Sequence, residues 1–145
     1  MAAAVKPDRL LVLGGVLSAM ASALHVGILI VGASWYRFFG ADEQMAQLAE
    51  AGNWYPPTIT ACIALALAMW ALYAFAGAGV IGRLPLMRVA LVAIPAIYLL
   101  RGLAIIPLLI RTPSGVTAFW WWSSLICLGY GIVHLIGVHR NWARL

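Results

Sequence analysis

Arg101 is the residue whose type and position best suit chemistry, because it lies inside a long apolar stretch, residues 86–110. A charged side chain within an apolar membrane segment is costly, so it needs a structural or functional reason. The guanidinium group presents forked N–H donors that match the oxygens of a carboxylate or a phosphate. We therefore predict that Arg101 binds an anionic group.

Polar side chains of the other apolar segments lie at a similar depth. At 1.5 Å per residue, Arg101 and His25 each lie about 22 Å from the basic end of their segments. Gly14, Ser18 and Ser22 precede His25 at helical spacing, which makes one face that suits close packing. The predicted ligand-binding residues are Arg101, His25, Tyr98, Ser22, Cys62 and Ser123.

Three interpretations of Arg101 stay open, because no aspartate or glutamate lies within the apolar segments. In the first, the side chain extends to the outer lipid headgroups. In the second, it pairs with Glu43 or Glu50 of the loop between the first two segments. In the third, Arg101 and His25 together bind the anionic group of a ligand or a lipid.

His134 marks a second polar cluster, about 6 Å from the basic end of the last segment. Tyr130 lies one turn away on the same helix face, and Tyr73 of the second segment lies at a similar depth. An interfacial histidine that is hydrogen-bonded to a tyrosine is the expected structure here. Haem ligation by His25 and His134 is excluded, because axial ligands share one level and these residues differ by about 16 Å.

Other chemistries lack their sequence signatures. Cys62 and Cys127 form no CxxC pair, and no metalloprotease, nucleophile-elbow, P-loop or dinucleotide-binding motif occurs. A proton antiporter that works through a carboxylate would need an acid within a segment. We therefore predict no catalytic residue, no metal site and no cofactor.

Composition indicates an integral membrane protein. Of the 145 residues, 65% are hydrophobic and only 9% are charged, whereas soluble domains carry about 25% charged residues. Four apolar segments are each long enough to cross a hydrocarbon core of about 30 Å. We predict a single all-α domain, a four-helix transmembrane bundle with helices over residues 10–31, 57–76, 86–110 and 117–138.

The basic residues predict the orientation of the bundle. Arg37 and Arg111 fall on one side of the predicted segments, and a larger set falls on the other. The larger set consists of Lys6, Arg9, Arg83, Arg88, Arg140 and Arg144. By the positive-inside rule, both termini lie in the cytoplasm and the protein lies in the plasma (inner) membrane. Because the basic residues are scattered, the predicted partner is the lipid bilayer and not a nucleic acid.

Aromatic residues gather at the opposite boundary. Trp35, Trp54 and Trp120 are predicted to form an aromatic rim there. The loop between the first two segments contains residues 42–51, whose pattern predicts a short extracytoplasmic amphipathic helix. This helix would lie on the outer face of the membrane, and the alternative is a lid that covers the bundle.

The N-terminus has two interpretations. Basic residues, an apolar run and the sequence Ala21-Ser22-Ala23 resemble a signal peptide with its cleavage site. Cleavage there would leave residues 24–31, a stretch too short to span a bilayer. We therefore expect the first segment to be retained.

The leading functional prediction is a non-enzymatic protein that binds, transports or senses a small anionic or amphipathic molecule or lipid in its outer half. In one alternative it is an accessory subunit or a homo-oligomeric structural protein, assembled through small residues such as Ser18 and Ala64. In another it is a membrane enzyme that acts on a lipid-soluble substrate through His25.

Overall fold

The structure, a computed structural model, describes residues 6–145, and within that range every secondary-structure element is helical. Four stretches are long and apolar enough to cross a membrane. They are α1 (Arg9–Val31), α4 (Tyr55–Ala78), α5 (Met87–Leu103) continued by α6 (Ile105–Arg111), and α7 (Ala118–Asn141) continued by η2 (Trp142–Arg144). Shorter elements are α2 (Ala33–Phe38), α3 (Glu43–Glu50) and the 3-10 turn η1 (Pro113–Gly115). The all-helical fold is confirmed, and four apolar helices suggest a membrane-embedded protein.

Local sequence sets the ends of α1 and α4. The Asp8 carboxylate caps α1 by accepting hydrogen bonds from the backbone N–H groups of Leu10 and Leu11, both at 3.0 Å. α1 ends at Val31, and the next residue is Gly32, whose φ of 79° is unfavourable for most other residues. Two prolines lie in the first turn of α4, where their missing N–H groups have no helical partner in any case.

α5 and α6 belong to one apolar segment that is broken at Ala104. Pro107 has no N–H to donate to the carbonyl of Leu103, and its ring crowds that carbonyl. The break leaves Arg101 in the last turn of α5. The segment expected as one helix over residues 86–110 is therefore two successive helices.

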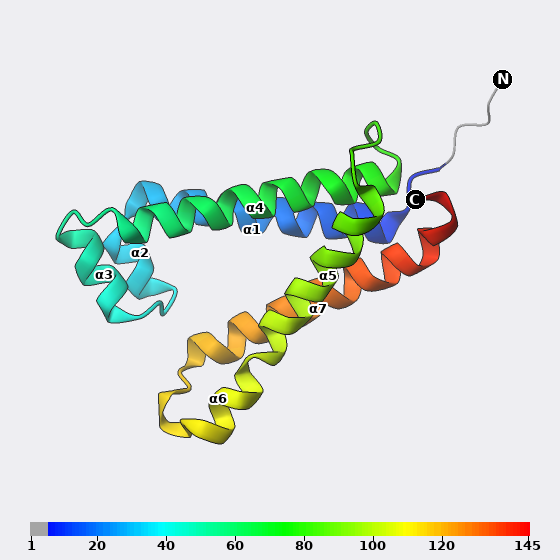
Figure 1. The fold of residues 1–145 in the computed structure, drawn as a ribbon. Helices are drawn as coiled ribbons and strands as arrows, with labels where there is room; N and C mark the ends of the chain where they lie inside the picture. Colours follow the sequence, from blue (N-terminus) through cyan, green and yellow to red (C-terminus); the bar gives the residue numbers. More distant parts are fainter. Residues whose placement is uncertain (1–5) are drawn as a thin grey trace.

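The long helices form two pairs that diverge. α1 lies against α4 and α5 lies against α7; the pairs meet near the C-terminus and separate toward their other ends (Figure 1). Where they meet, Leu11 and Leu91 are fully buried. Gly14 permits the close approach of α7, because a Cβ atom there would lie 2.9 Å from the His134 ring. The architecture is a V of two helix pairs and is more open than the predicted bundle.

α2 and α3 fold against the diverging end of α1 and α4 (Figure 1). Tyr36 of α2 is buried, and its hydroxyl hydrogen-bonds that of Thr60 in α4 at 2.7 Å. The loop after α2 also touches the other helix pair. A Cβ atom built on Gly40 would lie 3.1 Å from the Cβ of Phe119 at the start of α7. This contact links the separated ends. α3 occupies the region where a short helix was predicted, whereas α2 was not expected.

Candidate functional site

The Arg101 guanidinium lies between α5 and α7. Its Nη2 atom donates a hydrogen bond to the Ser123 hydroxyl of α7 at 3.2 Å. Its Cζ atom lies 4.6 Å from the centroid of the Trp120 ring, which is a cation–π contact. The Arg101 side chain is half-buried. Two neighbours on α7 therefore hold the guanidinium in place.

One nitrogen of this guanidinium, Nη1, is buried and has no hydrogen-bond partner among residues 6–145. Both ion pairs that the described residues make involve Arg37 instead. A buried donor that lacks an acceptor costs about 1–3 kcal/mol, and more when the group is charged. Nη1 therefore marks a place where an acceptor oxygen would be stabilising.

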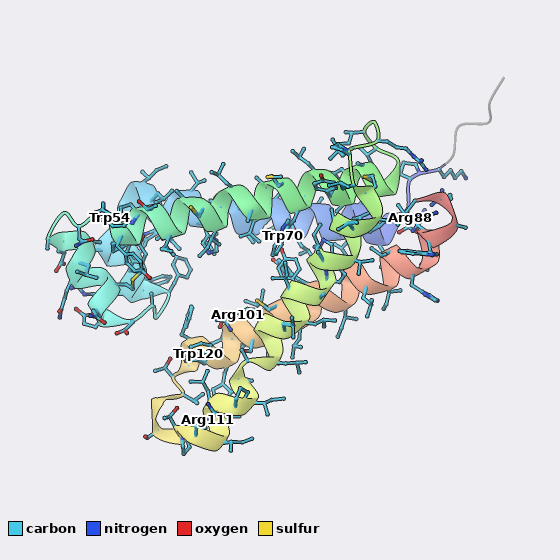
Figure 2. All side chains as sticks on the ribbon, viewed as in Figure 1. Trp54, Trp70, Arg88, Arg101, Arg111 and Trp120 are labelled. Carbon is cyan, nitrogen blue, oxygen red and sulfur yellow. The ribbon has the colours of Figure 1, made fainter. Side chains whose placement is uncertain are left out.

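Arg101 continues the face of α5 that looks toward α1 and α4. One turn earlier, the Tyr98 hydroxyl hydrogen-bonds Ser18 of α1 at 2.9 Å, and the Tyr98 ring lies 4.9 Å from that of Trp70 in α4. Residues three apart share a helix face, so Arg101 points to the same side. Figure 2 shows Arg101 and Trp120 on the side of α5 and α7 that faces α4, where the helix pairs diverge.

His25 lies on the facing side of α1 but is not bonded to Arg101. It follows Ser18 by seven residues, close to two helical turns, so both point toward α5 and α7. The His25 ring donates through Nδ1 to the carbonyl of Ala21 in its own helix at 2.8 Å. No hydrogen bond among the described residues joins His25 to Arg101. The two side chains thus lie on opposing helix faces.

The other residues of the predicted ligand-binding set lie elsewhere. The Ser22 hydroxyl donates to the carbonyl of Ala64 at 2.7 Å and so joins α1 to α4. Cys62 is exposed on α4. Within the described part of the chain, Arg101 and Ser123 are the predicted residues that are hydrogen-bonded to each other.

Ser18, Tyr98 and His134 form a buried polar cluster where the helix pairs meet. Ser18 Oγ lies 2.9 Å from the Tyr98 hydroxyl and 3.4 Å from Nε2 of His134. His134, which is 0% exposed, donates through Nδ1 to the carbonyl of Tyr130 at 2.8 Å. These groups satisfy one another and join α1, α5 and α7, so the cluster suits a packing role.

This buried cluster differs in membership from the predicted one. Tyr130 lies beside His134, whereas the Tyr73 hydroxyl donates to the carbonyl of Pro85 at 2.9 Å. Sequence reasoning did not assign Ser18 to this cluster. The signal was present in the position of Ser18, one turn after Gly14 on the packing face of α1.

Glu43 and Glu50 pair with Arg37 and not with Arg101. Arg37 Nη2 lies 2.8 Å from Oε1 of Glu43, and Nη1 lies 2.5 Å from Oε1 of Glu50. The hydrogen bonds from Arg37 lower the pKa of both carboxyls. The loop glutamates therefore fasten α2 to α3, and the interpretation in which one of them neutralises Arg101 is not the arrangement found.

The three tryptophans of the predicted rim do not surround Arg101. Trp35 packs on α1, where a Cβ atom on Gly27 would lie 2.7 Å from its ring. Trp54 is 71% exposed at the start of α4. A pocket of about 260 Å³ lies beside Trp54, and Arg101 is not among its walls. Trp120 is the rim residue that contacts the guanidinium.

Within residues 6–145, no group of three or more His, Cys, Asp or Glu side chains lies close enough to hold a metal ion. Comparisons with known proteins found no matching family model, no matching curated protein and no matching solved structure. What the chain does is therefore inferred from its own residues.

Proposed function

We propose that this chain is a small multi-pass membrane protein that binds a small anionic or amphipathic molecule, or a lipid, at Arg101. Four long apolar helices support the membrane location. The distribution of basic residues supports cytoplasmic termini in the plasma (inner) membrane. The binding site rests on one observation: the Nη1 atom of Arg101 is buried without a hydrogen-bond partner among residues 6–145.

An anion suits this place by charge and by geometry. Trp120 covers one face of the guanidinium, and Ser123 accepts a hydrogen bond from Nη2. Nη1 has no acceptor among residues 6–145, so a ligand oxygen that reached this buried atom would complete its hydrogen bonding. A carboxylate or phosphate pairs well with the forked donors of an arginine. Its negative charge would also offset the cost of holding Arg101 in apolar surroundings.

The surroundings favour a ligand with an apolar part. Arg101 lies where α5 and α7 diverge from α1 and α4 (Figure 2). The Gly40 contact with Phe119 spans the separated ends of the helix pairs. An amphipathic molecule in the bilayer would approach Arg101 from the side, with its anionic group on the guanidinium and its chain among lipid tails.

Extension of Arg101 to the lipid headgroups is the competing interpretation. The hydrogen bond to Ser123 and the contact with Trp120 hold the guanidinium against α7. An extended arginine would expose its nitrogens to water and headgroups, whereas Nη1 is buried. These contacts favour ligand binding over extension.

The two alternative functions gain no specific support. Ser18 and Ala64, the small residues suited to assembly with a partner, are buried between helices of this chain. They are therefore engaged in internal packing. His25, the residue on which an enzymatic function depended, bonds to the backbone of its own helix.

Replacement of Arg101 tests the proposal, with decanoate as the probe because it joins a carboxylate to an apolar chain. We expect decanoate to raise the melting temperature of the wild-type protein in neutral detergent. Arg101→Leu should bind decanoate roughly tenfold more weakly or worse, since a charge-assisted hydrogen bond is lost.

Arg111→Leu is the matched control, because it removes an exposed arginine from the same apolar segment. It should respond to decanoate as the wild type does. An equal response of the two variants would exclude Arg101 as the binding residue. No response of the wild type to either decanoate or decyl phosphate would overturn the proposed function.

A further inference from the structure

A shallow groove lies between the start of α5 and Trp142 of η2, near the end of the molecule where the C-terminus lies. Its volume is about 460 Å³, and it is lined by Arg88, Val89, Val92, Ala93 and Trp142. Figure 2 labels Arg88 at this end, far from Arg101 and Trp120. The groove is therefore separate from the site proposed above.

The groove combines one charged residue with apolar walls. Val89 is 66% exposed and Val92 is 50% exposed. With Ala93 they lie at helical spacing on one face of α5, which leads from Arg88 into the apolar segment. In water such a surface would be unfavourable, but in a bilayer it accepts an acyl chain. The groove therefore complements a phospholipid: Arg88 can face the charged headgroup, and the apolar residues can face an acyl chain.

The Arg88 guanidinium is placed to hold the headgroup. Its Cζ atom lies 5.4 Å from the centroid of the Trp142 ring. Stacking on a ring uses the face of the guanidinium and leaves the N–H groups at its edge for other partners. No ion pair among residues 6–145 involves Arg88. A phosphate can therefore accept forked hydrogen bonds from Arg88.

The charge around the groove selects among phospholipids. Two other arginines at this end are engaged with the C-terminal turn: Arg83 donates to the carbonyl of Arg144, and Arg144 donates to Asn141. They add positive charge near the groove, and Asp8 is engaged in capping α1. A net positive environment favours a lipid with net negative charge over a zwitterionic one.

We infer that this groove binds an acidic phospholipid, with its phosphate on Arg88 and Trp142 and one acyl chain along Val89, Val92 and Ala93. The inference rests on the proposed membrane location but not on ligand binding at Arg101. The groove would be a second binding site, at the end of the molecule where the helix pairs meet.

Lipid retention by the purified full-length chain tests this site. The probes are phosphatidylglycerol and phosphatidylcholine at equal amounts in mixed detergent micelles, and native mass spectrometry measures bound lipid. We expect the wild type to retain phosphatidylglycerol preferentially. Arg88→Gln should lower the retention of phosphatidylglycerol roughly tenfold. Val92→Trp, which fills the groove without a change of charge, should also lower it.

Arg140→Gln is the matched control, because Arg140 is exposed at the same end and its loss changes the net charge equally. It should retain phosphatidylglycerol as the wild type does. Equal losses in Arg88→Gln and Arg140→Gln would overturn the site in favour of general charge attraction. Equal retention of the two lipids by the wild type, no retention, or a dimer in place of the lipid would also overturn it.

Discussion

Arg88 and Arg101 both lie on α5 and both stack on a tryptophan, yet they suit different partners. Arg88 is exposed beside an apolar groove. Arg101 is half-buried, and one of its nitrogens is buried without a partner among the described residues. An exposed guanidinium keeps its hydration and can exchange partners, whereas a buried donor needs a lasting acceptor. Burial, more than residue type, therefore distinguishes the two arginines.

His134 is the residue whose loss should most weaken the junction of the helix pairs. His134→Ala removes a ring that is 0% exposed and leaves Tyr98 as the remaining side-chain partner of the Ser18 hydroxyl. We expect the free energy of unfolding to fall by about 3 kcal/mol. Unfolding in detergent, followed by tryptophan fluorescence, measures this change.

His139→Ala is the control for this prediction, because His139 is exposed in the last turn of α7. It should change the free energy of unfolding by less than about 0.5 kcal/mol. Comparable losses in the two histidine variants would contradict the packing role of His134.

At the scale of helices, Asp8 ties the start of α1 to the ends of two others. Its carboxylate caps α1, and its backbone N–H donates to the carbonyl of Ala78 in the last residue of α4 at 3.1 Å. Asn141, the last residue of α7, lies close enough to this carboxylate to lower its pKa. The start of α1 and the ends of α4 and α7 therefore meet at Asp8.

This carboxylate should make stability depend on pH. Partial burial alone would raise the pKa of Asp8, but hydrogen bonds and the charge of Arg140 outweigh it, and the net pKa is lowered. A carboxyl with a lowered pKa adds stability above its unfolded pKa, and this stability is lost as the pH falls through the folded value. We expect the free energy of unfolding to decline below about pH 4.

Asp8→Asn isolates the contribution of this charge, because asparagine keeps the helix cap without a titrating group. Glu43 and Glu50 also have lowered pKa values, so the difference between the wild type and Asp8→Asn is the relevant measurement. The variant should lose less stability between pH 6 and about pH 3. Parallel pH profiles would contradict the role of Asp8. Asp8→Ala, which lacks the cap, should cost about 1 kcal/mol at neutral pH.

At the scale of the whole molecule, two helix pairs are joined firmly at one end and lightly at the other. The firm end has the buried polar cluster and fully buried leucines such as Leu11. The light end has the contact of Gly40 with Phe119. Few packed side chains oppose a change of angle there, so we expect the separation of the pairs to depend on Phe119.

Phe119→Gly, which removes the Cβ atom that Gly40 approaches, should widen and lengthen the distance distribution between the separated ends. Spin labels at Trp54→Cys and Arg111→Cys, in a background with Cys62→Ser and Cys127→Ser, measure this distance by pulsed electron resonance. Phe38→Gly is the control, because Phe38 is an aromatic residue of α2 that is 79% exposed. An unchanged distribution in Phe119→Gly would show that the contact does not set the angle.

Much of the fold could be predicted because helix formation and helix ends are local properties. Apolar length predicted the four long helices, and Gly32 ends α1 through its own positive φ. The break before Pro107 was not part of the predicted single helix over residues 86–110, because a missing N–H alone does not decide a break: Pro95 lacks the same donor and lies inside the unbroken α5. Depth along a helix could also be counted from the chain, which singled out Arg101. α2 was missed because its six residues are too few for a clear periodic pattern.

The sequence by itself determined which residues are helical, apolar or charged, because these are properties of short stretches. Only the tertiary structure decided which side chains meet. Ser18 is hydrogen-bonded to Tyr98 and to His134. Glu43 and Glu50, which from their position in the sequence could have paired with Arg101, form ion pairs with Arg37 instead. Such contacts depend on the rotation and crossing angle of each helix, which result from packing over the whole interface. The same packing, close at one end and open at the other, decided that the four helices form a V.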